Sequence, residues 1–166
     1  MLVVLVRHGI ASPVGVDGAR SDAERGLSPE GLEKTREAAR GLATLLDAPP
    51  TVIASPLRRA QETAVVVAQA LHAPPPRTNP ALALGGPYEE ILADPALAAP
   101  KGDVVLVGHQ PSLEALASWL LTGEPDVRIE VKKASALAIG YPGVPRRGGG
   151  TLCWFLPPRV LRGLES

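Results

Sequence analysis

The stretch LVVLV at residues 2–6 runs without interruption into RHG at residues 7–9. A continuous apolar run rich in β-branched valine is typical of a strand that is buried on both faces of a parallel sheet. Arginine and histidine resist burial, so their place directly after the strand indicates that the strand ends at a binding site. In open α/β sheets, ligands bind outside the carboxyl ends of the strands.

Two further apolar runs end in charged groups. Residues 51–54 precede Ser55-Pro56-Leu57-Arg58-Arg59, and residues 103–107 precede Gly108-His109. If the three strands are parallel neighbours, their ends converge on one pocket that carries two imidazoles and several guanidinium groups. The third histidine, His72, lies before a proline run and is expected at the surface.

Helix signals lie between the strands. Ser28 followed by Pro29 is typical of a capped helix start, and the pattern predicts a helix that continues to about Leu46. Ser55-Pro56 repeats the signal and predicts a helix to about Leu71, and a further helix is expected over residues 112–121. Between residues 77 and 100 the pattern allows a short strand and a short helix near residues 88–92.

Two apolar runs near the end of the chain, residues 135–141 and 151–156, are separated by a Gly- and Pro-rich stretch. This arrangement predicts a hairpin near one edge of the sheet. With the alternating strands and helices before it, the chain is expected to form a three-layer α/β/α sandwich with a mostly parallel central sheet.

The length of 166 residues predicts a single domain, residues 1–166. Lys and Arg number 17, as do Asp and Glu, and this balance argues against a general nucleic-acid or anionic-membrane binder. The single cysteine, Cys153, permits no internal disulfide and is expected in the core. The apolar run at residues 2–6 is too short for a signal peptide or a membrane span, so a soluble, cytoplasmic protein is expected.

The groups at the three strand ends suit a phosphoryl ligand. Arginine presents a planar fork of donors that matches phosphate oxygens. The positive end of a helix starting at Ser55 would add N–H donors, and a neutral imidazole is a competent nucleophile at phosphorus. Gly9 and Gly108 are expected to let the ligand approach closely. Because side chains supply the positive charge, no metal ion or other cofactor is expected.

Three motifs together resemble the histidine phosphatase superfamily, which has a phosphoglycerate-mutase-like fold. They are Arg7-His8-Gly9, the Ser-Pro-x-x-Arg-Ala-x-x-Thr pattern at residues 55–63, and Gly108-His109. The short length, the pattern at residues 22–31 and the tail sequence are similar to the SixA-like phosphohistidine phosphatases. The resemblance covers nearly the whole chain except residues 77–100.

The resemblance implies a role for each matching residue. His8 would take the phosphoryl group as a covalent phosphohistidine, Arg7 and Arg59 would clamp the phosphate oxygens together with Gly9, and His109 would donate a hydrogen bond to them. Arg25 is a weaker candidate for a phosphate or substrate contact. Arg58 either points to solvent or contacts the substrate, and its spacing leaves both open.

Larger members of the superfamily carry a carboxylate general acid after the third strand, but residues 82–90 show no clear equivalent. Glu89 or Glu90 are candidates, although exposed acids at a helix start fit them better. A missing acid matters less for phosphohistidine, whose imidazole leaves easily, than for an alkyl phosphate. We therefore expect a metal-independent phosphatase of phosphohistidine on a phosphotransfer or signalling protein.

Two alternatives remain at this point. A phosphatase of small phosphomonoesters, of the sugar or glycerate phosphate type, would be favoured by a working acid and a closed basic pocket. A non-catalytic phosphate-binding module would be indicated by failure to trap phosphate on His8. The sequence leaves the oligomeric state open.

Overall fold

The computed structural model describes residues 1–83, 85 and 87–164. Its strands and helices follow one another in this order: β1 (Leu2–Arg7), η1 (Asp22–Glu24), α1 (Pro29–Ala43), β2 (Thr51–Ala54), α2 (Arg58–Ala70), β3 (Arg77–Thr78), η2 (Pro80–Leu82), α3 (Tyr88–Leu92), α4 (Pro95–Ala98), β4 (Val104–Gly108), α5 (Ser112–Thr122), β5 (Ala136–Gly140), β6 (Thr151–Leu156) and α6 (Pro158–Gly163).

The strands form one six-stranded sheet in the order β3-β2-β4-β1-β5-β6. Pairing is parallel from β3 through β1, and β5 runs antiparallel to both of its neighbours. The three strands that end in charged motifs, β2, β4 and β1, are therefore parallel neighbours in the middle of the sheet. This order brings their carboxyl ends to one edge, as the sequence predicted.

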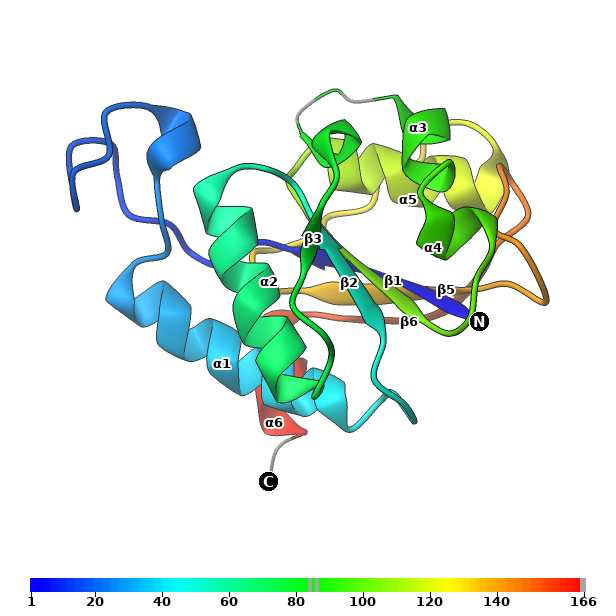
Figure 1. Ribbon diagram of the computed structural model, residues 1–166, viewed down its shortest axis with the longest axis horizontal. Coiled ribbons are helices and arrows are strands. Elements are labelled where there is room, and N and C mark those ends of the chain that lie inside the picture. Colours follow the sequence, from blue (N-terminus) through cyan, green and yellow to red (C-terminus); the bar gives the residue numbers. More distant parts are fainter. Residues whose placement is uncertain (84, 86, 165–166) are drawn as a thin grey trace.

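Helices cover both faces of the sheet, which gives the expected α/β/α layers. In Figure 1, α1, α2 and α6 lie on one side and α3, α4 and α5 on the other. Two apolar cores fill the spaces between the layers, and β1 contributes alternate residues to each. Val4 and Val6 face α1, α2 and α6, whereas Val3 and Leu5 face α3, α4 and α5. A strand buried on both faces must be apolar at every position, which explains the run at residues 2–6.

The first helix begins where its cap signal predicts. The Ser28 side chain accepts a hydrogen bond from the amide of Gly31 at 3.0 Å, and Pro29 occupies the first helical position. The helix ends at Ala43, before the predicted Leu46, with Thr44 as the capping residue. The prediction was wrong for α2, which begins at Arg58 and is preceded by Leu57 rather than capped by Ser55.

The tail forms the predicted hairpin of β5 and β6, with β6 at the edge of the sheet. Cys153 is exposed, so its prediction as a core residue was wrong. The register shifts between Ala138, which pairs with Trp154, and Ile139, which pairs with Leu152, so Cys153 has no paired residue opposite it. Cys153 thus lies at an unpaired position of an edge strand, which no further strand covers.

Among the described residues, no helix combines the length and the apolar character that a membrane crossing requires. His72 is exposed after the end of α2, as expected from its position before the prolines.

Candidate active site

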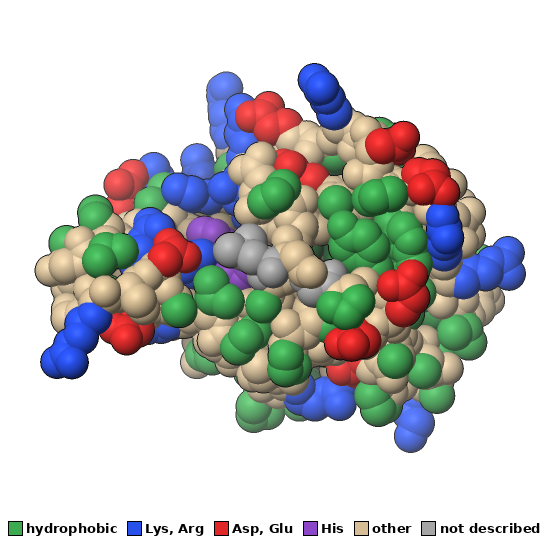
Figure 2. All heavy atoms as spheres, turned by 90° about the horizontal axis from the view of Figure 1, so that it is seen from above, with side chains coloured by type: hydrophobic (Ala, Val, Ile, Leu, Met, Phe, Trp, Pro, Cys, Tyr) green, Lys and Arg blue, Asp and Glu red, His purple; other side chains and the backbone are tan. Residues whose placement is uncertain are grey.

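The edge formed by the carboxyl ends of β1, β4 and β2 brings together the four residues that the sequence singled out most strongly. Arg7 ends β1 and His8 follows it, His109 follows β4, and Arg59 lies in the first turn of α2. The rings of His8 and His109 are 5.1 Å apart between centroids, and Arg59 Nε lies 3.3 Å from His8 Nε2. Histidine side chains are visible beside lysine and arginine side chains in Figure 2.

The ring of His8 is held from both sides. Its Nδ1 lies 2.7 Å from the carbonyl oxygen of Gly9, and its Nε2 accepts the hydrogen bond from Arg59. A carbonyl oxygen only accepts, so Nδ1 carries the proton and Nε2 carries the lone pair. Burial lowers the pKa of His8 to about 3, and the neighbouring His109, Arg59 and Arg7 act in the same direction. His8 is therefore neutral at pH 7, with an unprotonated Nε2.

His109 is also buried and neutral. Its Nε2 lies 2.7 Å from the hydroxyl oxygen of Ser55, which also accepts a hydrogen bond from the amide of Leu57 at 3.3 Å. Burial, followed by the charge of Arg59, lowers the pKa of His109 to about 4. Ser55, which the sequence indicated only as a helix cap, thus holds the second histidine in place.

Arg59 is buried and points across the site. Its Nη1 donates to the carbonyl of Asp22 at 2.7 Å, and its Nη2 donates to the Asp22 carboxylate at 3.0 Å. Arg25 Nη1 donates to the same carboxylate at 2.8 Å, and Arg25 Nε donates to the carbonyl of Ser12. Hydrogen bonds from Arg25 and then Arg59 lower the pKa of Asp22. Arg25 therefore lies behind Asp22 and braces the loop that holds Arg59.

Arg7 reaches the opposite side of the site. Its Nη1 donates to the carbonyl of Val131 at 2.8 Å, and burial lowers its pKa while Glu114 acts against that shift. Three buried polar atoms have no hydrogen-bond partner among the described residues: Arg7 Nε, His109 Nδ1 and Ser135 Oγ. The backbone of Ser135 accepts from the amide of Arg7, so the three atoms belong to this region. Buried polar atoms without partners fit a site that binds a ligand rich in oxygen atoms.

Gly9 serves the site through its backbone. Its carbonyl holds His8, and its amide donates to the hydroxyl of Thr63 at 3.0 Å. A Cβ at position 9 would lie 2.2 Å from the hydroxyl oxygen of Thr35 in α1, so the space beside Gly9 is filled by a helix. At position 108 a Cβ would meet Leu113 at 3.1 Å. A side chain at either position would therefore meet a helix, and the close approach of a ligand to these glycines stays a prediction.

The weaker candidates lie at the surface. Arg58 is half-exposed and pairs with Glu62 at 2.7 Å, and Glu62 also accepts from the amide of Leu27. Glu89 and Glu90 are exposed in the first turn of α3. Leu84 and Gly86, within the stretch where larger relatives carry their acid, lie outside the described residues. Among all the residues that the structure describes, no group of three His, Cys, Asp or Glu side chains is placed to hold a metal ion.

Three residues that hold the site were not assigned to it from the sequence: Ser55, Thr63 and Asp22. Thr63 accepts from Gly9 and donates to the carbonyl of Arg59 at 2.7 Å. Ser55 and Thr63 are the first and last residues of the Ser-Pro-x-x-Arg-Ala-x-x-Thr pattern, and Asp22 stands three residues before Arg25. Their place in these motifs could have assigned the three residues to the site. The spacing alone does not indicate the hydrogen-bond partner of each residue.

The comparison with known proteins agrees with this geometry. The model of the histidine phosphatase superfamily (branch 1) matches residues 3–83. An uncharacterised protein of Picosynechococcus sp. (strain ATCC 27264 / PCC 7002 / PR-6) is 34% identical over 141 residues, which is 84% of each chain.

Two solved structures illustrate the structural similarity. The protein histidine phosphatase SixA complexed with tungstate is 26% identical, with a TM-score of 0.82 over 97% of this chain and 99% of that one. The alpha-ribazole phosphatase of Shigella flexneri shares the fold at 21% identity, with a TM-score of 0.69 over 95% of this chain and 97% of that one. Sequence motifs, strand-end geometry and these relatives lead to one assignment: the chain belongs to the histidine phosphatase superfamily, is SixA-like, and is a phosphatase.

Proposed function

We propose that this phosphatase hydrolyses phosphohistidine on a protein that takes part in phosphotransfer or signalling, through a covalent phosphohistidine on His8. The observation that carries the proposal is the state of His8: its Nδ1 faces the Gly9 carbonyl, and its unprotonated Nε2 faces Arg59. Neutral imidazole held in one tautomer is an activated nucleophile.

In the first step, the Nε–H of Arg59 passes from His8 Nε2 to a phosphoryl oxygen, which frees the Nε2 lone pair. His8 Nε2 then attacks the phosphorus of the substrate phosphohistidine, a new N–P bond forms, and the substrate N–P bond breaks. Arg59, Arg7 and the Nδ1 of His109 surround the position where charge collects on the phosphoryl oxygens. A neutral His109 donates from Nδ1 when the hydroxyl of Ser55 donates to its Nε2 across their contact of 2.7 Å. In the second step, water attacks phosphorus, and phosphate and free His8 are released.

The leaving group favours phosphohistidine as the substrate. A substrate imidazole that carries a proton on its other nitrogen leaves as a neutral ring, so it needs no proton from the enzyme. Asp22 is tied to the site, but its lowered pKa keeps it ionised and unable to donate a proton. Glu89 and Glu90 are exposed on α3. An alkyl phosphate would leave as an alkoxide and would depend on such a donor.

The test is turnover in EDTA of a phosphotransfer protein phosphorylated on histidine, measured beside p-nitrophenyl phosphate. We expect faster dephosphorylation of the protein, with loss of both activities in His8→Ala and retention in His72→Ala, which removes an exposed histidine away from the site. Quenched reactions should trap acid-labile, alkali-stable phosphate on His8.

The other outcomes distinguish the alternatives. Turnover of the small ester alone would support a phosphatase of small phosphomonoesters, the class in which the alpha-ribazole phosphatase of similar fold falls. Phosphate binding without turnover of either substrate would indicate a non-catalytic binding module. Loss of activity in EDTA, restored by added metal, would contradict the expected independence from metal ions.

A further inference from the structure

A basic groove opens beside the active site. We use this name for the cavity of about 460 Å³ lined by Arg7, Lys34, Lys132, Lys133 and Arg162 together with apolar and small residues. Its walls come from the end of β1, the first turns of α1, the segment before β5, and α6. Arg7 belongs both to this groove and to the candidate active site, so the two adjoin at the end of β1.

The positive charge of the groove is local. The whole chain has a formal net charge of +0, yet no Asp or Glu is found among the described residues that line this cavity. Two of the cations have acidic neighbours on α1: Lys34 pairs with Glu30, and Arg162 lies 3.4 Å from Glu37. Lys132 and Lys133 are exposed, and neither forms an ion pair with any residue that the structure describes. These two lysines leave the groove with uncompensated positive charge.

The side chains of the groove suit an extended acidic surface better than one fixed anion. Exposed lysines are flexible point charges, and they steer and orient a charged partner without building a rigid pocket. The buried donors without partners, which would fix a single phosphate, belong to the active site. We propose that this groove is a docking surface for an acidic segment of the phosphorylated protein substrate, next to its phosphohistidine. The inference rests on the proposed function and names a feature of its substrate.

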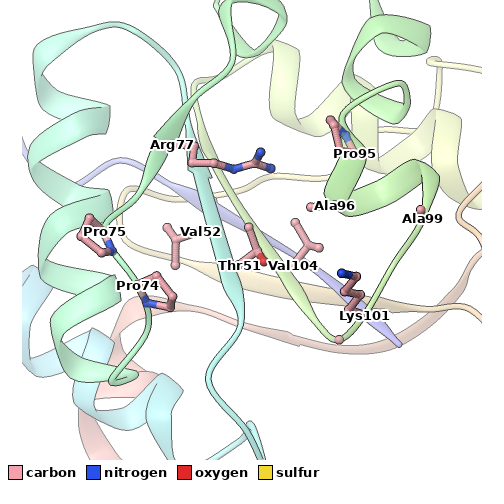
Figure 3. A pocket seen from close by; sticks show the side chains of 11 residues that line it. Thr51, Val52, Pro74, Pro75, Arg77, Pro95, Ala96, Ala99, Lys101 and Val104 are labelled. Atoms are coloured by element: carbon pink, nitrogen blue, oxygen red, sulfur yellow. The ribbon is translucent and has the colours of Figure 1, made fainter.

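A second cavity in the protein provides a control. It has a volume of about 340 Å³ and contains the cations Arg77 and Lys101 (Figure 3). It lies at the amino ends of β2 and β4, on the edge of the sheet opposite the histidines, and Arg77 is paired with Asp94 at 2.6 Å. Arg146 is exposed on the loop after β5, which also leaves the sheet at the amino end of β1 because Gly140 pairs with Leu2. Charge changes at Lys101 and Arg146 therefore act far from the groove.

The experiment compares two peptides that carry one phosphohistidine and differ only in Glu or Gln residues beside it. At low ionic strength we expect the wild type to prefer the Glu peptide about tenfold in kcat/KM, mainly through KM. Lys132→Glu with Lys133→Glu should remove the preference, and Lys101→Glu with Arg146→Glu, which reverses the same number of charges, should retain it. Melting temperatures verify that each variant folds, and p-nitrophenyl phosphate turnover normalises the rates.

A second measurement separates this inference from the proposed function. A fluorescent Glu peptide without phosphate should bind the wild type, and the Lys132→Glu, Lys133→Glu variant should bind it about tenfold more weakly. If neither phosphopeptide is hydrolysed but this difference appears, the proposed substrate fails and the acidic docking surface stands. Equal kcat/KM values for the two phosphopeptides, together with no binding of the fluorescent Glu peptide, would overturn the docking surface. Weaker inhibition by inorganic phosphate in the lysine variant, without any peptide preference, would also overturn it and indicate a small-anion site.

Discussion

Arg59 donates a hydrogen bond from Nε to Nε2 of His8 across 3.3 Å, while its two other nitrogens are held by Asp22. One guanidinium thus contacts the proposed nucleophilic atom of His8 and a fixed carboxylate at the same time. A planar group with donors on three sides is required for this geometry. The arginine is therefore already in place where, in the proposed reaction, the phosphoryl group meets His8.

Replacement of Arg59 by lysine should lower kcat/KM about 100- to 1000-fold, because an ammonium group cannot be held by Asp22 and donate to the phosphoryl oxygens in the same fork. Arg58→Lys is the matched control, since Arg58 lies next to it in sequence but pairs with Glu62 at the surface. Steady-state kinetics with p-nitrophenyl phosphate measure both. Equal losses in the two variants would show that Arg59 has no special place in the reaction.

Ser55→Ala should lower kcat on the order of 10-fold or more with little change in KM, because His109 loses the hydroxyl that selects its tautomer. Ser28→Ala is a contrasting variant from the other Ser-Pro pair. It removes the cap of α1 and should cost about 1 kcal/mol of unfolding free energy while kcat is retained. Kinetics and urea denaturation on both proteins check the two effects. A Ser55→Ala enzyme with normal kcat would contradict the role of this contact.

Stability should fall as the pH is lowered from about 6.5 toward 4. The folded-state pKa values of about 3 for His8 and about 4 for His109 lie below the ordinary histidine value of 6.5. Within that window the unfolded chain binds protons at these histidines that the folded chain does not bind, so acid favours unfolding. Each histidine contributes a slope of at most about 1.4 kcal/mol per pH unit.

Urea denaturation at about pH 5 and about pH 7.5 measures this effect as a difference in unfolding free energy. His109→Gln should reduce the difference, whereas His72→Gln should leave it unchanged because His72 is exposed. A wild-type protein that is equally stable at both pH values would show that the two buried histidines are protonated alike in the folded and unfolded states.

Gly9→Ala should destabilise the protein by about 1–3 kcal/mol, because the new methyl group would overlap Thr35 and force α1 away from the end of β1. The Cβ would lie 2.2 Å from the Thr35 hydroxyl oxygen and 3.1 Å from Leu27. A Cβ at position 102 would meet no described atom within 4 Å, so Gly102→Ala is the control. Urea denaturation measures the free energy of unfolding of both variants. Equal values for Gly9→Ala and Gly102→Ala would mean that Thr35 moves aside without loss of stability.

Local patterns predicted the strands and the charged strand ends well, because a strand buried on both faces must be apolar throughout and because ligands bind at strand ends. They failed where the decisive contact comes from a distant part of the chain. Asp22 is 37 residues from Arg59, and Ser55 is 54 residues from His109. No local preference of Ser55 distinguishes a helix cap from a partner of histidine; the order of β2, β4 and β1 decides it.

One other failure has the same origin. The apolar sequence of β6 resembles that of a buried strand, and only its place at the edge of the sheet leaves Cys153 in solvent.

The central position of β1 has a consequence for how the protein loses its activity. Hydrogen bonds from β4 on one side and β5 on the other enclose β1, and Val3, Val4 and Leu5 are fully buried. Amide protons in such a strand exchange with solvent only when the whole molecule opens. The slowest-exchanging amides should therefore lie directly before His8, the proposed nucleophile, and the backbone of His8 should keep its position through every partial opening that spares the sheet.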